Sequence, residues 1–125
     1  MPKDQKRGFT LLLKAAQLGN AQAQSKVGIE YRFGGLVASD LAKAYYWLLK
    51  SARQGNVTGQ FIVAQHYFYG EGIKQDKVRG LAWLLIAAEK DRQLAKHIVT
   101  LERKMTKRQI LAAKSLANRW WASKQ

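Results

Sequence analysis

The residue types that could do chemistry in this chain are two histidines and eight carboxylates, and cysteine is absent. Two carboxylates that flank a substrate suit general acid–base catalysis, and histidines that meet other ligands suit a zinc site. His66 and His97 have no partner of ligand type at i, i+4, and no two carboxylates have a catalytic spacing. The glycine turns are not followed by the Gly-Lys-Ser/Thr of a phosphate loop. We therefore expect no enzyme, no metal site and no cofactor, and histidines that are hydrogen-bonded or exposed.

Three of the acidic residues belong to a pattern that repeats along the chain. Asp4, Asp40 and Asp76 are each 36 positions apart, and the same spacing relates many apolar, aromatic and glycine residues. The equivalent sets include Leu12, Leu48 and Leu84; Ala16, Ala52 and Ala88; Trp47 and Trp83; Tyr31 and Tyr67; and Gly34 and Gly70. A repeat of this length is typical of stacked helical units that cannot bury their apolar faces alone. Such arrays commonly present a surface to a partner instead of building a reaction centre.

Each unit has the pattern of a helix, a glycine turn and a second helix. Residues 20–33 carry one apolar stripe at helical spacing. The stripe consists of Ala23, Val27 and Tyr31. Gly34 then ends the helix, because glycine accepts the left-handed backbone of a helix C-terminus. The three equivalent aspartates are predicted to cap the second helix of each unit by accepting backbone N–H bonds.

The repeat divides the chain, a single domain over residues 1–125, into four parts. These are a half repeat (1–19), two full repeats (20–55 and 56–91) and a C-terminal cap (92–125). The cap has an apolar stripe that no glycine turn follows. The stripe consists of Leu94, Ile98, Leu101 and Met105. Thr106 and Gln109 have the spacing of a capping box, which predicts a last helix over residues 107–122.

The half repeat begins just before the second helix of its unit, so the first helix of that unit has no counterpart. Either the chain is a fragment of a longer protein, or the repeat pattern has been trimmed at this end. In both cases Phe9, Leu12 and Leu13 are expected to form an apolar face that is incompletely covered. The half repeat is therefore a candidate surface for a homo-oligomer.

The formal net charge is +14, and residues 90–125 carry ten basic and two acidic groups. A basic region of this density favours an acidic protein face, nucleic acid or an anionic membrane surface as partner. The alternative is an ordinary solvated surface. No stretch approaches the ~20 apolar residues that span a bilayer. The N-terminus has no apolar region of the signal-peptide kind, so the chain as written is expected in the cytoplasm.

Two stretches resemble a known repeat family. One is YFYGEGIKQDKVRGLAWLLIAA from Tyr67, and the other begins with YRFGGLV at Tyr31. Over roughly residues 1–91 they are similar to the Sel-one-like repeat, a relative of the tetratricopeptide repeat. Leu36 replaces the second turn glycine of that pattern, and Gly80 stands where alanine is usual. The resemblance implies an all-α fold, an α/α superhelical solenoid of helix-turn-helix repeats with a C-terminal capping helix pair, and an adaptor or scaffold role.

In such a solenoid the first helices line a concave face, and their residues outside the apolar stripe are candidates for partner binding. Aromatic residues and arginine are the usual hot-spot material on a face of this kind. The candidates are Arg32, Phe33, Phe61, Gln65, Phe68, Tyr69, Lys96, Arg103, Lys104, Lys107 and Arg108. One alternative is that Phe33, Phe61 and Phe68 pack between adjacent units. The other is that the basic residues form an ordinary solvated helix face.

The predicted function is that of an adaptor that binds an acidic protein or peptide through aromatic anchors and a basic rim. Its positive field would speed encounter and make association sensitive to salt. An alternative is sequence-independent nucleic-acid binding through the basic C-terminal helices, with Trp120 or Trp121 stacking on bases. No recognised nucleic-acid-binding motif supports this alternative. A third hypothesis is that the chain only caps a longer solenoid and has no partner of its own.

Overall fold

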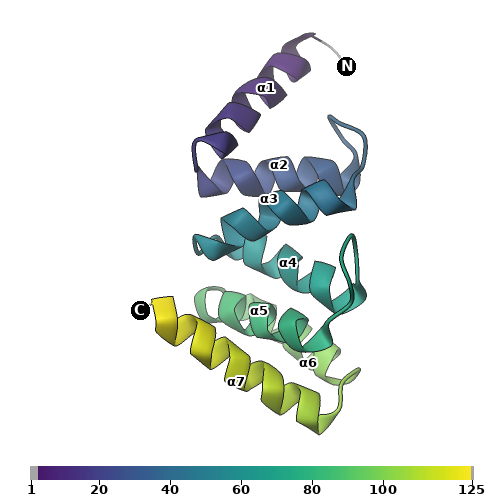
Figure 1. Cartoon of the computed structure of the whole chain (residues 1–125), viewed down its shortest axis with the longest axis vertical. Coiled ribbons are helices and arrows are strands. Elements are labelled where there is room, and N and C mark those ends of the chain that lie inside the picture. Colours follow the sequence, from purple (N-terminus) through teal and green to yellow (C-terminus); the bar gives the residue numbers. More distant parts are fainter. Residues whose placement is uncertain (1–2, 125) are drawn as a thin grey trace.

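The computed structural model describes residues 3–124, with side chains as far as residue 120, and this part of the chain is a stack of helices (Figure 1). In chain order the elements are α1 (Lys3–Gln17), α2 (Ala21–Phe33), α3 (Leu41–Arg53), α4 (Val57–Tyr69), α5 (Lys77–Lys90), the 3-10 turn η1 (Arg92–Leu94), α6 (Ala95–Glu102) and α7 (Lys107–Lys124). The described residues contain no strand. None of their helices combines the length and apolar character that crossing a bilayer requires.

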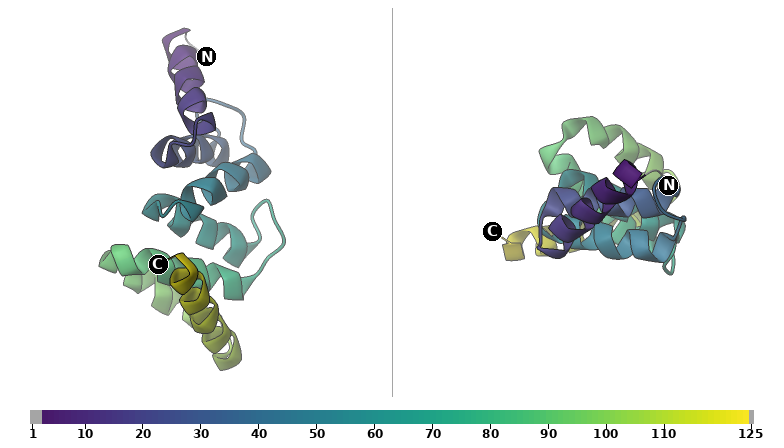
Figure 2. Two further views of the ribbon diagram at one scale, coloured as in Figure 1. Left: turned by 60° about the vertical axis from the view of Figure 1, so that its left-hand side comes forward. Right: turned by 90° about the horizontal axis from the view of Figure 1, so that it is seen from above.

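Helices that are close in sequence pack together and form one open stack. α2 with α3 and α4 with α5 make two hairpins, and α3 packs on α4 to join them. α1 packs on α2 at one end, and α7 packs on α5 at the other. Figure 2 shows that the helices change direction from one layer to the next along the stack. The all-α superhelical solenoid predicted from the sequence is confirmed.

Aspartate side chains start the second helix of both full repeats. Asp40 Oδ1 accepts a hydrogen bond from the backbone N–H of Lys43 at 3.0 Å. Asp76 Oδ1 accepts the equivalent bond from Arg79 at 3.0 Å, so both predicted caps are confirmed. The predicted cap at Asp4 is wrong, because α1 begins before this residue and Asp4 lies inside its first turn. A carboxylate in that turn still stabilises the helix through the helix dipole.

The turns of the two full repeats differ where Leu36 takes the place of Gly72. Gly34 and Gly70 end the first helices with left-handed φ angles of 72° and 70°. Gly72 also has a φ of 74°, a conformation that leucine adopts only with strain. Leu36 has no positive φ. Its turn is held instead by Glu30, whose Oε2 accepts the backbone N–H of Leu36 at 2.9 Å.

The buried apolar side chains form two clusters. The central cluster lies among α3, α4, α5, α6 and α7, and its most deeply buried large members are Leu48, Phe68, Leu81 and Leu84. The N-terminal cluster lies between α1 and α2, and its buried members are Phe9, Ala16, Ala23 and Val27. Tyr31 packs against both clusters and so connects them.

The apolar face of the half repeat is better covered than the sequence suggests. Phe9 is 9% exposed, and its ring meets Tyr31 edge-on with 6.1 Å between the centroids. Leu12 and Leu13 are half-buried against the same cluster. The expectation of an incompletely covered face at these residues is therefore wrong, because α2 and the turn after it supply the missing partner. Self-association through the half repeat stays a prediction, and its exposed apolar residues include Leu11 and Leu18.

A capping box starts the last helix. The backbone N–H of Thr106 donates to Gln109 Oε1 at 2.9 Å, and the backbone N–H of Gln109 donates to Thr106 Oγ1 at 3.1 Å. These reciprocal bonds confirm the predicted start of α7. The C-terminal part of the chain is thus a pair of helices, α6 and α7, that follows the short turn η1.

α7 closes the central core. Ala113 and Ala117 are buried, and Trp120 packs against Trp83 with 5.2 Å between their ring centroids. The Trp120 side chain is therefore partly buried against the central cluster. The side chain of Trp121, the other residue predicted to stack on bases, lies outside the described residues.

Candidate partner-binding surface

Side chains cross between the first helices α2, α4 and α6. Arg32 of α2 reaches residues of α4, and Phe61 of α4 contacts His97 of α6 with 5.0 Å between the ring centroids. These contacts bring the candidates of α2 and α4 to one side of the stack, which we call the first-helix face. The residues that define this face are Phe33, Phe61, Gln65, Tyr69 and His97.

Arg32 holds the two full repeats together. Its Nη2 forms an ion pair with Glu71 Oε1 at 3.1 Å and donates to Gln65 Oε1 at 3.4 Å. Its Nη1 lies 3.1 Å from Nε2 of the buried His66. The Arg32 side chain is only 13% exposed. Arg32 and Gln65 thus support the first-helix face by joining α2 to α4 and to the turn after α4.

His66 is buried and hydrogen-bonded on both ring nitrogens, which determines its tautomer. Nδ1 lies 2.7 Å from the carbonyl oxygen of Glu71, and because a carbonyl can only accept, Nδ1 carries the proton. Nε2 then accepts from Arg32. Burial lowers the pKa of His66 and the charge of Arg32 acts in the same direction, whereas the bond to Glu71 opposes them. The fold therefore contains the neutral imidazole.

The free energy of unfolding is expected to decrease as the pH falls below about 6.5, the ordinary pKa of histidine. In that range the unfolded chain takes up a proton at residue 66, whereas folded His66 stays neutral because its pKa is lowered. One such group contributes a slope of at most ~1.4 kcal/mol per pH unit. Chemical denaturation over this pH range measures the slope, and a His66→Gln variant should lose that part of it. Equal slopes in the two proteins would contradict the assignment.

Phe33 and Tyr69 occupy the same position in successive repeats, and both are exposed. Each is the last residue of a first helix. Phe33 is 72% exposed and Tyr69 is 47% exposed. An isolated exposed apolar residue needs no explanation, but two large aromatic side chains at equivalent positions form a repeated surface feature. Both rings are accessible to another molecule on the first-helix face.

A small groove lies next to Tyr69, between α4 and α6. Its volume is about 50 Å³, and Phe61, Tyr69, His97 and Thr100 contribute to its walls. The binding residues predicted from the sequence do not include His97. The 36-residue spacing indicates its position, because His97 on α6 is equivalent to Phe61 on α4.

Phe68 does not belong to the first-helix face. It is 1% exposed and packs against α5, where a Cβ atom added to Gly80 would lie 2.8 Å from the Phe68 Cβ. Its nomination as a binding residue is therefore corrected. The contact with Gly80 is made within one repeat, since α4 and α5 belong to the same unit.

The predicted basic patch lies at the C-terminal end of the stack. Its members Lys96, Arg103, Lys104, Lys107 and Arg108 are all exposed. Lys104 connects the patch to the aromatic residues: its Nζ lies 3.3 Å from Tyr69 Oη and 5.1 Å from the centroid of that ring. The other four residues lie on α6, in the following turn and at the start of α7. The surface that results combines aromatic contact area with positive charge.

The described residues include no group of three or more histidines or carboxylates that could hold a metal ion. On the first-helix face Arg32 and Gln65 bond to each other, and the exposed groups include the rings of Phe33 and Tyr69 and the ammonium group of Lys104 beside Tyr69. Groups of these kinds can make apolar contacts, cation–π contacts and ion pairs.

A stack of equivalent helical hairpins, with the same residues repeated at their caps and turns, defines a helical repeat solenoid. The sequence profile of the Sel1 repeat matches residues 1–20, 21–56 and 57–91. The chain belongs to the Sel1 repeat family.

The solved structures that resemble this one include two repeat proteins. The protective antigen c5321 of uropathogenic Escherichia coli strains, which displays an SLR fold, matches with a TM-score of 0.87 and 29% identity over 92% of this chain. The chain spans only 25% of the length of that antigen. A Sel1 repeat protein from Oxalobacter formigenes matches with a TM-score of 0.68 and 27% identity, over 71% of this chain and 68% of its own. None of the curated protein sequences matches the chain.

Proposed function

We propose that this protein is an adaptor that binds an acidic segment of a partner protein on its first-helix face. Sel1 repeat proteins are generally scaffolds for protein interactions. The observation that carries the proposal is the exposure of Phe33 and Tyr69 at equivalent positions of the two repeats. Exposed aromatics of this kind supply most of the binding energy in many interfaces.

The residues of the face have different roles in this proposal. Phe33 and Tyr69 are the apolar anchors, and Phe61 contributes to the wall of the groove beside Tyr69, between α4 and α6. Lys104 lies beside the Tyr69 ring and is placed to meet a carboxylate of the partner. The net charge of +14 favours an acidic segment and speeds its encounter with the protein.

The proposal predicts that the double variant Phe33→Ala/Tyr69→Ala loses partner binding. Proteins retained from a lysate of the source organism are compared by quantitative mass spectrometry between this variant and the unchanged chain. Removing two hot-spot aromatics should lower the affinity for a true partner roughly tenfold or more. Tyr46→Ala is the matched control, because Tyr46 is 53% exposed but lies on the second helix α3.

Salt dependence tests the electrostatic part of the proposal. For a partner identified in this way, Lys104→Gln and added salt should both slow association, because they weaken the attraction before contact. A partner that binds Phe33→Ala/Tyr69→Ala and Tyr46→Ala equally well would overturn the proposed surface. An affinity that is unchanged between low and high salt would overturn only the acidic character of the partner.

Nucleic-acid binding finds less support, because Trp120 already packs against Trp83 and is only half-exposed. Titration of single- and double-stranded oligonucleotides at physiological salt separates the two functions. Tight binding that Phe33→Ala/Tyr69→Ala leaves unchanged would favour nucleic acid over a protein partner.

A further inference from the structure

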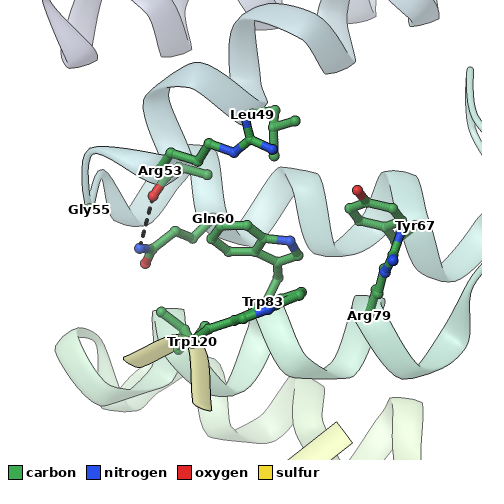
Figure 3. A pocket seen from close by; sticks show the side chains of 10 residues that line it. Leu49, Arg53, Gly55, Gln60, Tyr67, Arg79, Trp83 and Trp120 are labelled. Carbon is green, nitrogen blue, oxygen red and sulfur yellow. Dashed lines mark hydrogen bonds between the residues drawn. The ribbon is translucent and has the colours of Figure 1, made fainter. Parts of the chain in front are cut away.

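A pocket of about 330 Å³ opens on the other set of helices, between α3 and α5 and next to the end of α7 (Figure 3). It is distinct from the first-helix face, because second helices supply most of its lining. Its volume is at the lower end of the range of small-molecule sites, about 300 to 1,000 Å³. A pocket of this size suits a ligand no larger than one substituted amino acid.

The walls of the pocket are largely aromatic. Trp83 and Trp120 meet at one side with 5.2 Å between their ring centroids and 46° between their planes. Tyr67 lines the opposite end, where its hydroxyl oxygen lies 2.6 Å from that of Tyr45. Aromatic walls of this kind favour a flat apolar group, which gains both burial and ring contact.

Gln60, one of the residues that line the pocket, has a buried acceptor that lacks a hydrogen bond. Gln60 is 2% exposed, and its Nε2 donates to the carbonyl oxygen of Ala52 at 3.2 Å, as Figure 3 shows. That bond determines which amide atom is the oxygen. Among the described residues, Gln60 Oε1 is the buried side-chain polar atom without a hydrogen-bond partner. A buried acceptor in this state is destabilising unless another molecule supplies a donor.

The preceding repeat shows how the same glutamine can be satisfied. Gln24, the equivalent of Gln60, donates to Ala16 O at 3.0 Å, and its Oε1 accepts from Gln54 Nε2 at 2.8 Å. Gln54 also donates to Gly19 O. In the second repeat the position of Gln54 is taken by Lys90, whose Nζ donates to Gly55 O at 2.7 Å. The second repeat thus keeps the bond to the glycine carbonyl, whereas Gln60 Oε1 lacks the bond that Gln24 Oε1 receives from Gln54.

Two arginines give the pocket a positive field. Arg53 and Arg79 both line it, and the described lining residues include no carboxylate. Asp76, outside the lining, lies 3.6 Å from Arg79 Nε and is itself exposed. Burial raises the pKa of Tyr45, while Arg53 and Arg79 both act to lower it, so the fields of the two guanidinium groups overlap at this end of the pocket.

We propose that this pocket binds a small carboxylate that carries a flat apolar group and an amide N–H. The apolar group would pack against Trp83 and Trp120, the carboxylate would face Arg53 and Arg79, and the N–H would donate to Gln60 Oε1. An N-acylated aromatic amino acid has this chemistry, and so does the C-terminal residue of a peptide. The site is independent of the adaptor function, because Phe33 and Tyr69 take no part in it.

Calorimetric titration of the full chain with N-acetyl-L-phenylalanine tests the proposal. The matched ligands are N-acetyl-L-phenylalaninamide, which lacks the carboxylate, and 3-phenylpropionate, which lacks the N–H. Each is expected to bind roughly tenfold more weakly than the complete ligand. The peptide acetyl-Gly-Gly-Phe distinguishes the sources: tighter binding than the free amino acid indicates a peptide C-terminus, and weaker binding indicates a free metabolite.

Variants link the binding to the residues of the pocket. Arg53→Gln/Arg79→Gln should lower the affinity for N-acetyl-L-phenylalanine roughly tenfold and leave the affinity for N-acetyl-L-phenylalaninamide unchanged. Arg7→Gln/Arg92→Gln removes the same charge from exposed positions on α1 and η1 and should change neither. Phe33→Ala/Tyr69→Ala should also bind the ligand normally, so failure here is distinguishable from failure of the adaptor proposal.

Lys90→Gln tests the acceptor. Glutamine at this position recreates the pair formed by Gln24 and Gln54, so it should raise the denaturation midpoint. It should also lower the affinity for N-acetyl-L-phenylalanine without lowering the affinity for 3-phenylpropionate. Gln54→Lys should lower the midpoint by creating the same defect in the first repeat. No binding of either acetylated acid at millimolar concentration, or equal binding of the acid and its amide, would overturn the proposal.

Discussion

Replacing Phe68 by alanine is expected to lower the free energy of unfolding by about 3 to 5 kcal/mol. Phe68 is 1% exposed and is the largest side chain among the fully buried ones of the described residues. Truncation removes its apolar area from the core and leaves a cavity between α4 and α5, which two paired helices cannot close without losing other contacts. Urea denaturation followed by circular dichroism measures the change.

Phe33→Ala is the control for this prediction, since it makes the same change on the exposed end of α2. Its effect on stability is expected to stay within about 0.5 kcal/mol, whereas the proposed function predicts that it weakens partner binding. Equal destabilisation by the two variants would contradict the division between a core phenylalanine and a surface phenylalanine.

Gly80→Ala is expected to destabilise the protein by about 1 to 3 kcal/mol, although alanine is the better helix former. The added Cβ would lie 2.8 Å from the Cβ of Phe68 and 2.9 Å from its Cα and its N. Backbone atoms cannot rotate away as the end of a side chain can, so α5 would have to move off α4. Thermal unfolding with a van't Hoff analysis gives the loss.

Gly8→Ala makes the identical substitution on α1, where nothing lies within 4 Å of the added atom. There the higher helix propensity of alanine should raise the stability by roughly 0.5 to 1 kcal/mol. The two substitutions thus have opposite predicted signs. A stabilising Gly80→Ala would show that the contact between α4 and α5 is looser than the distances indicate.

The contact between α4 and α5 also explains why glycine stands at position 80, where the family pattern usually has alanine. The repeat places Gly28 and Ala44 at the crossing of α2 with α3, and their equivalents at the crossing of α4 with α5 are Ala64 and Gly80. Each crossing therefore has one glycine and one alanine, with the glycine on opposite helices. Position by position, Gly80 replaces alanine. When both helices of the crossing are considered, each pair keeps one glycine, which allows the two helices to approach closely.

Most of the fold could be predicted because local rules and the repeat agree. Helix caps at Asp40 and Asp76, the glycine turns and the capping box at Thr106 each depend on a few neighbouring residues. The predicted cap at Asp4 is wrong because Lys3 is already helical, although Asp4 is equivalent to Asp40 and Asp76 in the repeat. The repeat predicts equivalent positions, whereas the first residue of a helix also depends on the residues before it.

The candidate surface was less predictable because exposure depends on how closely two helices approach. Phe33 and Phe68 both lie outside the apolar stripes, yet one is exposed and the other is fully buried. Arg32 likewise reads as a surface cation, whereas its bonds to Glu71 and His66 depend on where the superhelix places the next repeat. The burial of Phe68 arises from the contact of α4 with α5, and the bonds of Arg32 arise from the contact between two repeats, so neither property is encoded in a single helix.

The connection of the two core clusters through Tyr31 has a consequence for how the molecule opens. In a linear stack each layer is stabilised only by its neighbours, so the layers can unfold in sequence from an end. α1 packs on α2, where Phe9 meets Tyr31, whereas α2 is also joined to α3 by the close crossing at Gly28 and by the bond from Ser51 Oγ to Ala21 O. The layer that can fray first at this end is therefore α1, and its opening leaves Phe33 and Tyr69, the two proposed anchors, on helices that stay paired.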